Sequence, residues 1–296
     1  FQTDGTVEEK WEIVTRTENN GEAILPGIAA TILAKIEEKK IDKAEVAGVG
    51  IGVPGPVEET GEIPCAVNLH WGRKNIEKEL GDLTGLAVKA GNDANVAALG
   101  EMWKGGGQGA KNLILVTLGT GVGGGIIVNE KIVTGAHGAG GEIGHAFVNP
   151  AETKACNCGN KGCLEQYASA TGIARLAKEA LESETEDSVL RTVKNISAKS
   201  VFDAYKEGDV LAGKIVDKFA AYLGNALAVF ACVSDPDVFV IGGGVSKAGQ
   251  VLIDAVEKYY KAHAFTASKE TPIKLATLGN DAGIYGAAKL ILSKDN

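Results

Sequence analysis

A glycine-rich stretch between two apolar runs restricts the fold of this chain more than any other feature of its sequence. Residues 116–127 read Val-Thr-Leu-Gly-Thr-Gly-Val-Gly-Gly-Gly-Ile-Ile. The pattern predicts a strand that turns at Gly119-Thr120-Gly121 and returns as a second strand over 125–129. Such a turn presents consecutive backbone N–H groups, which suit phosphate oxygens. No Lys-Ser/Thr pair follows and no helix begins there, so this is neither a Walker A loop nor a dinucleotide-binding fingerprint. By itself the stretch fits phosphate binding and an ordinary hairpin equally well.

Short apolar runs alternate with helical patterns along the rest of the chain. Strands are expected at 11–17, 47–53, 86–90, 112–118, 131–133, 238–241 and 273–276. Helices are expected at 27–39, 74–81, 95–103, 170–182, 201–207, 209–232, 251–263 and 282–292. This alternation indicates α/β layers with largely parallel sheets.

Size and charge exclude several classes of protein. The 296 residues suit two modest domains or one large one. A net charge of -8 argues against a nucleic-acid partner, because a phosphate backbone attracts a basic face. The longest apolar stretches, such as Val238–Ile241, are far shorter than the roughly 20 residues of a membrane span. No secretion signal opens the sequence, so we expect a cytoplasmic protein that binds neither nucleic acid nor a membrane.

Three of the five cysteines lie within eight residues, in Cys156-Asn-Cys-Gly-Asn-Lys-Gly-Cys163. An odd number with this crowding is not the pattern of a secreted disulfide framework. The thiols of Cys156, Cys158 and Cys163, with the imidazole of His145, supply the four ligands of a Cys₃His structural zinc site. Free buried thiols and a disulfide are the alternatives, and His145 is assigned as the fourth ligand only because it lies nearby in the sequence.

Several polar side chains follow predicted strands or lie beside the cysteines. Asn92-Asp93 falls between a strand and a helix, where α/β proteins place ligands. The same position is also the usual place of a helix N-cap, and by itself the cap explanation is favoured. Glu142 and Glu165 would be ordinary surface glutamates if each stood alone. Carboxylates from three separate loops are, however, what a polyhydroxylated ligand requires, since each can accept from two sugar hydroxyls.

Together these motifs resemble those of the ROK family of sugar kinases and repressors, within the actin-like ATPase superfamily. Leu118–His145 is similar to the family signature, and Cys156–Glu165 is similar to its zinc motif. Asn92-Asp93 resembles the family's catalytic pair, and Gly242–Ser246 resembles its adenosine-side loop. The resemblance covers nearly the whole chain, and within the family the glucokinases of Gram-positive bacteria are the most similar.

The resemblance implies an α/β, two-lobed actin-like ATPase (ribonuclease H-like) fold with ATP and sugar in a cleft between the lobes. Residues 1–102 with 284–296 would form the small lobe, and 103–283 the large lobe, with a zinc knuckle at 145–165. The family's opening strand and its Asp-x-Gly-Gly-Thr phosphate loop have no counterpart here. We therefore expect this sequence to begin after them, inside a hairpin.

The reaction that the resemblance implies is phosphorylation of glucose to glucose 6-phosphate by ATP. Asp93 would be the general base that takes the proton of the sugar 6-hydroxyl. The implied sugar contacts are Gly55, Asn92, Asp93, Glu142, His145 and Glu165. The implied nucleotide contacts are Gly119, Thr120, Gly121, Gly123, Gly242, Gly243 and Gly244. Mg²⁺ is expected to arrive with ATP, and Zn²⁺ to be a structural ion held by His145, Cys156, Cys158 and Cys163.

Three alternatives remain at the level of sequence. A repressor of the same family would carry a DNA-binding helix-turn-helix, whereas Phe1–Thr17 is predicted as strands. A non-catalytic sugar-binding regulator would keep the pocket without the chemistry. A kinase for another hexose or an N-acetylhexosamine would differ in pocket size, which the sequence does not display. The family resemblance also implies a homodimer or higher homo-oligomer.

Overall fold

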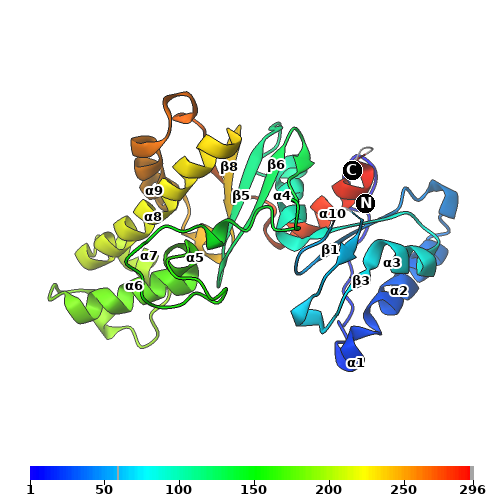
Figure 1. Ribbon diagram of the computed structural model, residues 1–296, viewed down its shortest axis with the longest axis horizontal. Helices are drawn as coiled ribbons and strands as arrows, with labels where there is room; N and C mark the ends of the chain where they lie inside the picture. The colour runs from blue at the N-terminus through cyan, green and yellow to red at the C-terminus, as the bar shows by residue number, and fades with distance from the viewer. Residues whose placement is uncertain (59, 294–296) are drawn as a thin grey trace.

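The computed structural model describes residues 1–58 and 60–293, which form two lobes on either side of a central pair of helices (Figure 1). The small lobe contains the parallel pair β1 (Val49–Val53) and β4 (Val88–Asn92) and the antiparallel pair β2 (Glu62–Ile63) and β3 (Lys74–Asn75). Its helices are α1 (Glu18–Gly21), α2 (Ile24–Glu38) and α3 (Ile76–Thr84).

The large lobe is built on a five-stranded sheet with the strand order β7-β6-β5-β8-β9. Its strands are β5 (Leu113–Leu118), β6 (Val122–Val128), β7 (Lys131–Ile132), β8 (Val238–Gly242) and β9 (Ile273–Leu275). The sheet is mixed, because β5–β8 and β8–β9 are parallel whereas β5–β6 and β6–β7 are antiparallel. The expected largely parallel arrangement therefore holds for only part of it. Its helices are α5 (Glu165–Ala168), α6 (Ala170–Ser183), α7 (Ala198–Lys206), α8 (Val210–Ser234) and α9 (Gln250–His263).

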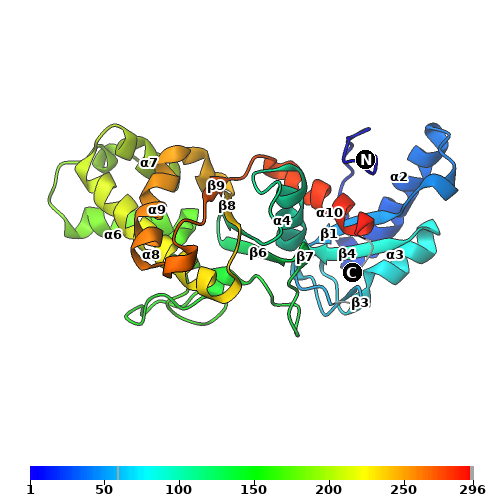
Figure 2. The same ribbon diagram turned by 90° about the horizontal axis from the view of Figure 1, so that it is seen from above.

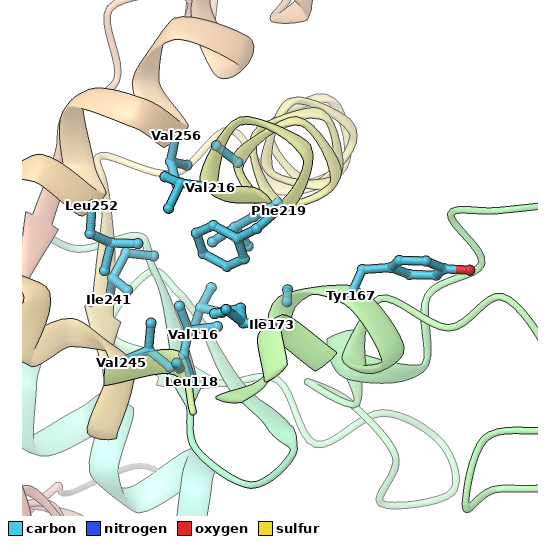
Figure 3. Close-up of a cluster of buried hydrophobic side chains, with 14 of the residues drawn as sticks. Val116, Leu118, Tyr167, Ile173, Val216, Phe219, Ile241, Val245, Leu252 and Val256 are labelled. Atoms are coloured by element: carbon cyan, nitrogen blue, oxygen red, sulfur yellow. The ribbon is translucent and has the colours of Figure 1, made fainter. Parts of the chain in front are cut away.

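Strand β5 is apolar along its length because both of its faces are buried. Side chains alternate across a strand, so Val116 and Leu118 face the helices of the large lobe while Leu113 and Leu115 face the centre of the molecule. Figure 3 shows the apolar cluster that contains Val116 of β5 and Ile241 of β8, with Phe219 of α8 at its centre.

The two lobes meet where α4 (Asp93–Lys104) crosses α10 (Ala282–Leu292), and both views show these helices side by side (Figures 1 and 2). The crossing is packed backbone against backbone. A Cβ added to Gly100 would lie 2.1 Å from the Ala282 carbonyl oxygen, and one added to Gly286 would lie 1.5 Å from that of Val96. No larger residue fits at either position without separating the helices.

Two expectations about the chain need correction. The segment 11–17 is not a strand; it has no regular secondary structure, and Val14 is 82% exposed. Side-chain ion pairs, such as Glu9 with Lys35 and Lys39, fasten the neighbouring residues instead. Within the described residues, α8 is the one helix long and apolar enough to span a membrane. The expectation that every apolar stretch is too short for a membrane span is therefore wrong for α8. In the most apolar part of α8, 56% of the residues are buried in the fold, and buried core helices can have the same length and composition.

Candidate functional site

Asn92 lies at the point where β4 ends and α4 begins, and its side chain performs two tasks. Its Oδ1 accepts hydrogen bonds from the N–H groups of Ala94 (3.0 Å) and Asn95 (3.2 Å), which makes it the N-cap of α4. Its Nδ2 donates to the Gly55 carbonyl oxygen at 3.0 Å. The cap and the predicted site therefore coincide, and the cap fixes Asn92 against the loop that follows β1.

Asp93 is the first residue of α4, and its side chain is exposed. Its Oδ1 accepts from the Ala94 N–H at 2.8 Å, which orients the carboxylate at the helix terminus. The residue that follows Asp93, Ala94, lies against the glycine-rich hairpin. A Cβ added to Gly123 would lie 3.8 Å from the Ala94 Cβ, so the start of α4 packs on the start of β6.

The glycine-rich turn and the loop after β8 lie next to each other. Strands β5 and β8 are parallel with Thr117 opposite Gly242, so their carboxyl ends meet at one edge of the sheet. Gly243 has φ +82°, and a Cβ there would lie 2.6 Å from backbone atoms of Leu118. Backbone bonds hold the turn itself: the Ala170 N–H donates to Gly119 O at 2.8 Å.

Several polar groups of the turn are bonded within the protein, among them the Gly119 N–H, which donates to the Gly121 carbonyl oxygen at 2.9 Å. The Thr171 hydroxyl donates to the Thr120 carbonyl oxygen at 2.7 Å, whereas the Thr120 residue is itself exposed. The structure thus places Gly119–Gly123 and Gly242–Gly244 around one edge of the large sheet, near the N-terminus of α4.

The four predicted metal ligands converge. The ligand atoms of His145, Cys156, Cys158 and Cys163 all lie within 4.8 Å of one another. Cys158 Sγ and Cys163 Sγ are 3.6 Å apart, and Cys156 Sγ is 3.8 Å from His145 Nδ1. In a tetrahedral site with zinc–sulfur bonds of about 2.3 Å, ligand atoms lie roughly 3.8 Å apart. Three sulfurs and one nitrogen at this spacing fit a zinc ion.

The thiols differ in their surroundings. Burial raises the pKa of the Cys163 thiol to about 12, and burial also raises the pKa of Cys156. A hydrogen bond from the Asn160 backbone N–H lowers the pKa of Cys158. A cation among these sulfurs would favour the thiolate forms, because metal binding displaces thiol protons.

Glu165 connects the cysteine knuckle to the glycine-rich hairpin. Its Oε1 lies 3.6 Å from Cys156 Sγ, and its Oε2 accepts from the Val122 N–H at 3.0 Å. Glu142 lies on the other side, with Oε2 3.9 Å from His145 Nε2. His145 therefore directs one ring nitrogen at the cysteines and the other at Glu142. No hydrogen bond or ion pair between described residues joins these side chains to Asp93.

A buried network supports the knuckle from behind. Glu152 accepts from the Tyr167 hydroxyl at 2.6 Å and pairs with Arg175 at 2.9 Å. Burial alone would raise the pKa of Glu152, but the Tyr167 hydrogen bond, the Lys154 backbone N–H and the Arg175 charge lower it to about 2. Figure 3 shows the Tyr167 hydroxyl directed away from the apolar cluster. Tyr167 also stacks on Tyr222 with ring centroids 4.0 Å apart.

Sequence reasoning did not single out two buried polar residues of α4. Asn95 is 4% exposed, its Oδ1 has no hydrogen-bond partner among the described residues, and it lines a cavity of about 410 Å³ with Asn92 and Thr134. Glu101 is 1% exposed. Both are polar residues on the apolar face of a helix rich in Ala, Val and Leu, and this break in the pattern could have identified them from the sequence.

Comparisons with known proteins agree with this arrangement. The ROK family model matches residues 1–294. A glucokinase of Halalkalibacterium halodurans is 43% identical over 99% of this chain and 91% of its own length. A glucokinase of Thermotoga maritima is 36% identical over 97% of this chain and 91% of its own length.

A solved structure extends the agreement to three dimensions. The ROK family glucokinase of Streptomyces griseus, in complex with glucose and AMPPNP, superposes with a TM-score of 0.73 at 33% identity. The superposition covers 97% of this chain and 92% of that one. The likeness therefore includes both lobes, and the fold is the actin-like ATPase fold of ROK kinases. This chain belongs to the ROK family.

Proposed function

We propose that the protein transfers the γ-phosphoryl group of ATP to the 6-hydroxyl of glucose. Relatives named glucokinase at 36–43% identity and a related glucokinase structure with glucose and an ATP analogue support this function. The observation that carries it is the placement of Asp93, an exposed carboxylate at the N-terminus of α4 whose neighbour Ala94 packs on the glycine-rich hairpin.

Asp93 is the proposed general base. Phosphoryl transfer requires positioned reactants, charge stabilisation and a base for the attacking hydroxyl rather than covalent chemistry by the protein. The Asp93 carboxylate would take the proton of the 6-hydroxyl as that oxygen attacks the γ-phosphorus. General-base assistance of this kind is worth about 10²- to 10⁴-fold in rate.

The sugar site we propose lies between the loop after β1 and the cysteine knuckle. Gly55, Asn92 and Asp93 would contact the sugar from one side, and Glu142, His145 and Glu165 from the other. The hydrogen bond from Asn92 to Gly55 and that from Val122 to Glu165 fix the orientation of these groups before the sugar binds. Preorganisation lowers the entropy lost on binding.

The nucleotide site we propose is the edge of the large sheet where β5 and β8 end. The turn residues Gly119, Thr120, Gly121 and Gly123 would hold the phosphates, and Gly242, Gly243 and Gly244 would pack near the adenosine. The Gly119 N–H already donates to the Gly121 carbonyl oxygen at 2.9 Å, so Thr120 and Gly121 would supply the backbone donors. Mg²⁺ would be held mainly by phosphate oxygens and water. The lobes would be residues 1–102 with 284–296 and residues 103–283, of which 59 and 294–296 lie outside the described residues. Closure of the lobes would exclude water from the phosphate.

The metal we propose is a structural Zn²⁺ bound by His145, Cys156, Cys158 and Cys163. When bound, it would fix the knuckle and leave the second nitrogen of His145 facing the sugar site. The 3.6 Å approach of Glu165 to Cys156 couples the metal site to a proposed sugar contact.

The test is an assay of ADP formation with Mg-ATP and a panel of hexoses, on the full-length protein. We expect ADP release that depends on glucose and is weak with fructose or N-acetylmannosamine. Absence of release with every sugar, together with stabilisation of the protein by sugar on heating, would favour the sugar-binding regulator instead.

A further inference from the structure

The chain passes between the lobes twice, and the two connections lie side by side. After α4 it runs through residues 105–107 towards β5, and after β9 it runs through residues 276–279 towards α10 (Figure 2). The connections are in close contact, since a Cβ added to Gly106 would lie 2.4 Å from the Leu275 carbonyl oxygen.

One buried carboxylate holds both connections. Glu101, in the last turn of α4, accepts from the Gly106 N–H at 2.8 Å and from the Thr277 N–H at 3.1 Å through Oε2. Its Oε1 accepts from the Leu278 N–H at 2.9 Å. One donor thus comes from the first connection and two come from the second. Three donors satisfy a carboxylate that is only 1% exposed to solvent.

Burying the Glu101 carboxylate would cost folding free energy without these three hydrogen bonds. A buried carboxylate is tolerated only where hydrogen bonds compensate its lost hydration. Here two of the three compensating donors are backbone groups separated from Glu101 by 176 and 177 residues of sequence, so the full set of bonds forms only when both connections are in place. The absence of a side chain at Gly105 makes room for the carboxylate, because a Cβ there would lie 2.0 Å from Glu101 Oε2.

We propose that Glu101 is a positioning residue that sets the angle between the lobes. This rests on the proposed function. Glu101 and Asp93 lie on the same helix, eight residues or about 12 Å apart at 1.5 Å per residue. By fixing the C-terminal end of α4 to both connections, Glu101 determines where Asp93 stands relative to the nucleotide site when the lobes close.

The substitution Glu101→Gln tests this with almost no change of shape. A glutamine has one acceptor oxygen and an NH₂ group, so at least one of the three backbone N–H groups would face another donor. Gly105→Ala is a second variant that displaces the carboxylate and leaves its charge. The matched control is Asp209→Asn, which removes a carboxylate that also accepts from backbone N–H groups, those of Ala212 and Val189, within the large lobe.

Each full-length variant would be assayed well below its thermal midpoint for kcat and for KM of glucose and ATP. Small-angle X-ray scattering would measure the fall in radius of gyration on adding glucose. We expect Glu101→Gln and Gly105→Ala each to lower kcat by at least about tenfold, since small misplacements of a catalytic group cost up to about 10²-fold. Both variants should also show a smaller compaction on adding glucose. Asp209→Asn should lose stability but keep kcat and compaction.

A merely structural role for Glu101 would lower the thermal midpoint and leave kcat and compaction as in the unmodified protein, and that outcome would overturn the proposal. If Glu101→Gln does not fold, Gly105→Ala decides by the same two readouts. The proposed function fails separately: in that case the unmodified protein itself would form no glucose-dependent ADP.

Discussion

Glu165 accepts a hydrogen bond from the Val122 N–H at 3.0 Å, and this contact joins the cysteine knuckle to the first residue of β6. Because Val122 follows the glycine-rich turn directly, one carboxylate touches both the proposed metal site and the edge of the proposed phosphate site. The two proposed sites therefore share one side chain.

Substituting Glu165 tests its proposed contact with sugar. Glu165→Ala should raise KM for glucose by about tenfold or more, because a hydrogen bond to a charged group is worth roughly 1.5–3 kcal/mol. Glu165→Gln should have a smaller effect, since its amide oxygen can still accept from Val122. Steady-state kinetics with varied glucose would measure both, with exposed Glu182→Ala as the control. An unchanged KM in Glu165→Ala would remove Glu165 from the sugar site.

Substituting Asp93 tests the general base. Asp93→Asn should lower kcat by about 10²- to 10⁴-fold while the fold remains, because the amide cannot take the hydroxyl proton. Glucose should still raise the thermal midpoint of the variant. The readouts are ADP release and thermal unfolding with and without glucose. Appreciable turnover in Asp93→Asn would contradict the assignment.

A pair of glycine substitutions tests the proposed nucleotide site. Gly243→Ala should raise KM for ATP by about tenfold or more, because the added methyl group meets the Leu118 backbone at 2.6 Å and displaces the loop. Gly249→Ala is the matched control: its φ of +83° is almost the same as the +82° of Gly243, but no atom lies within 4 Å of the added Cβ. Both variants carry backbone strain of about 1–3 kcal/mol, because their φ and ψ lie in a region that essentially only glycine adopts, and only the first adds the clash. Equal KM values for ATP in the two variants would argue against a nucleotide site at Gly243.

Removing one thiol tests the metal site. Cys158→Ser should lower bound zinc from about one ion per chain to nearly none and should destabilise the knuckle, because a structural zinc site needs all four ligands. Zinc content by elemental analysis and the thermal midpoint would measure these effects. Cys232→Ser, at an exposed position of α8, is the control. Equal zinc in both variants would exclude the proposed site.

The pH dependence of stability tests the network behind the knuckle. The pKa of Glu152 falls from 4.5 to about 2 on folding, so its contribution is complete above pH 4.5 and is lost as the pH falls towards 2. The side chain is only 7% exposed, and the shift corresponds to on the order of 3 kcal/mol. Glu152→Gln should therefore be much less stable than the unmodified protein at pH 6, and the difference should shrink at pH 3. Urea unfolding at both pH values would measure it; a difference independent of pH would contradict the assignment.

Elements with a clear period or clear ends could be predicted from the sequence. The helix expected at 282–292 has those bounds in the structure, and the strand expected at 112–118 differs by one residue. The second strand of the glycine hairpin was expected at 125 but begins at Val122. Glycines at 123–125 carry no side-chain alternation, so only pairing with β5 defines that start.

The site could be predicted only as far as local patterns extend. The spacing of Cys156, Cys158 and Cys163 suggested a cluster, and their thiols do lie together. Glu101 could not be found in the same way, because its partners are backbone N–H groups in a distant segment and no side-chain pattern marks them. For Asn92 the choice between cap and site had no answer in the sequence, since the structure uses the same side chain for the cap and for the contact with Gly55.

The contact of α4 with α10 at Gly100 and Gly286 forms a pivot between the lobes that lies close to the proposed base. Gly100 lies seven residues from Asp93, or about 10 Å along the helix. A rotation of about 10° around this point would carry Asp93 through about 2 Å. It would carry the outer helices of the large lobe, which lie farther from the crossing, through larger arcs (Figure 1). A displacement of about 2 Å is large for a catalytic group, so the angle between the lobes would decide whether the proposed base reaches the sugar hydroxyl.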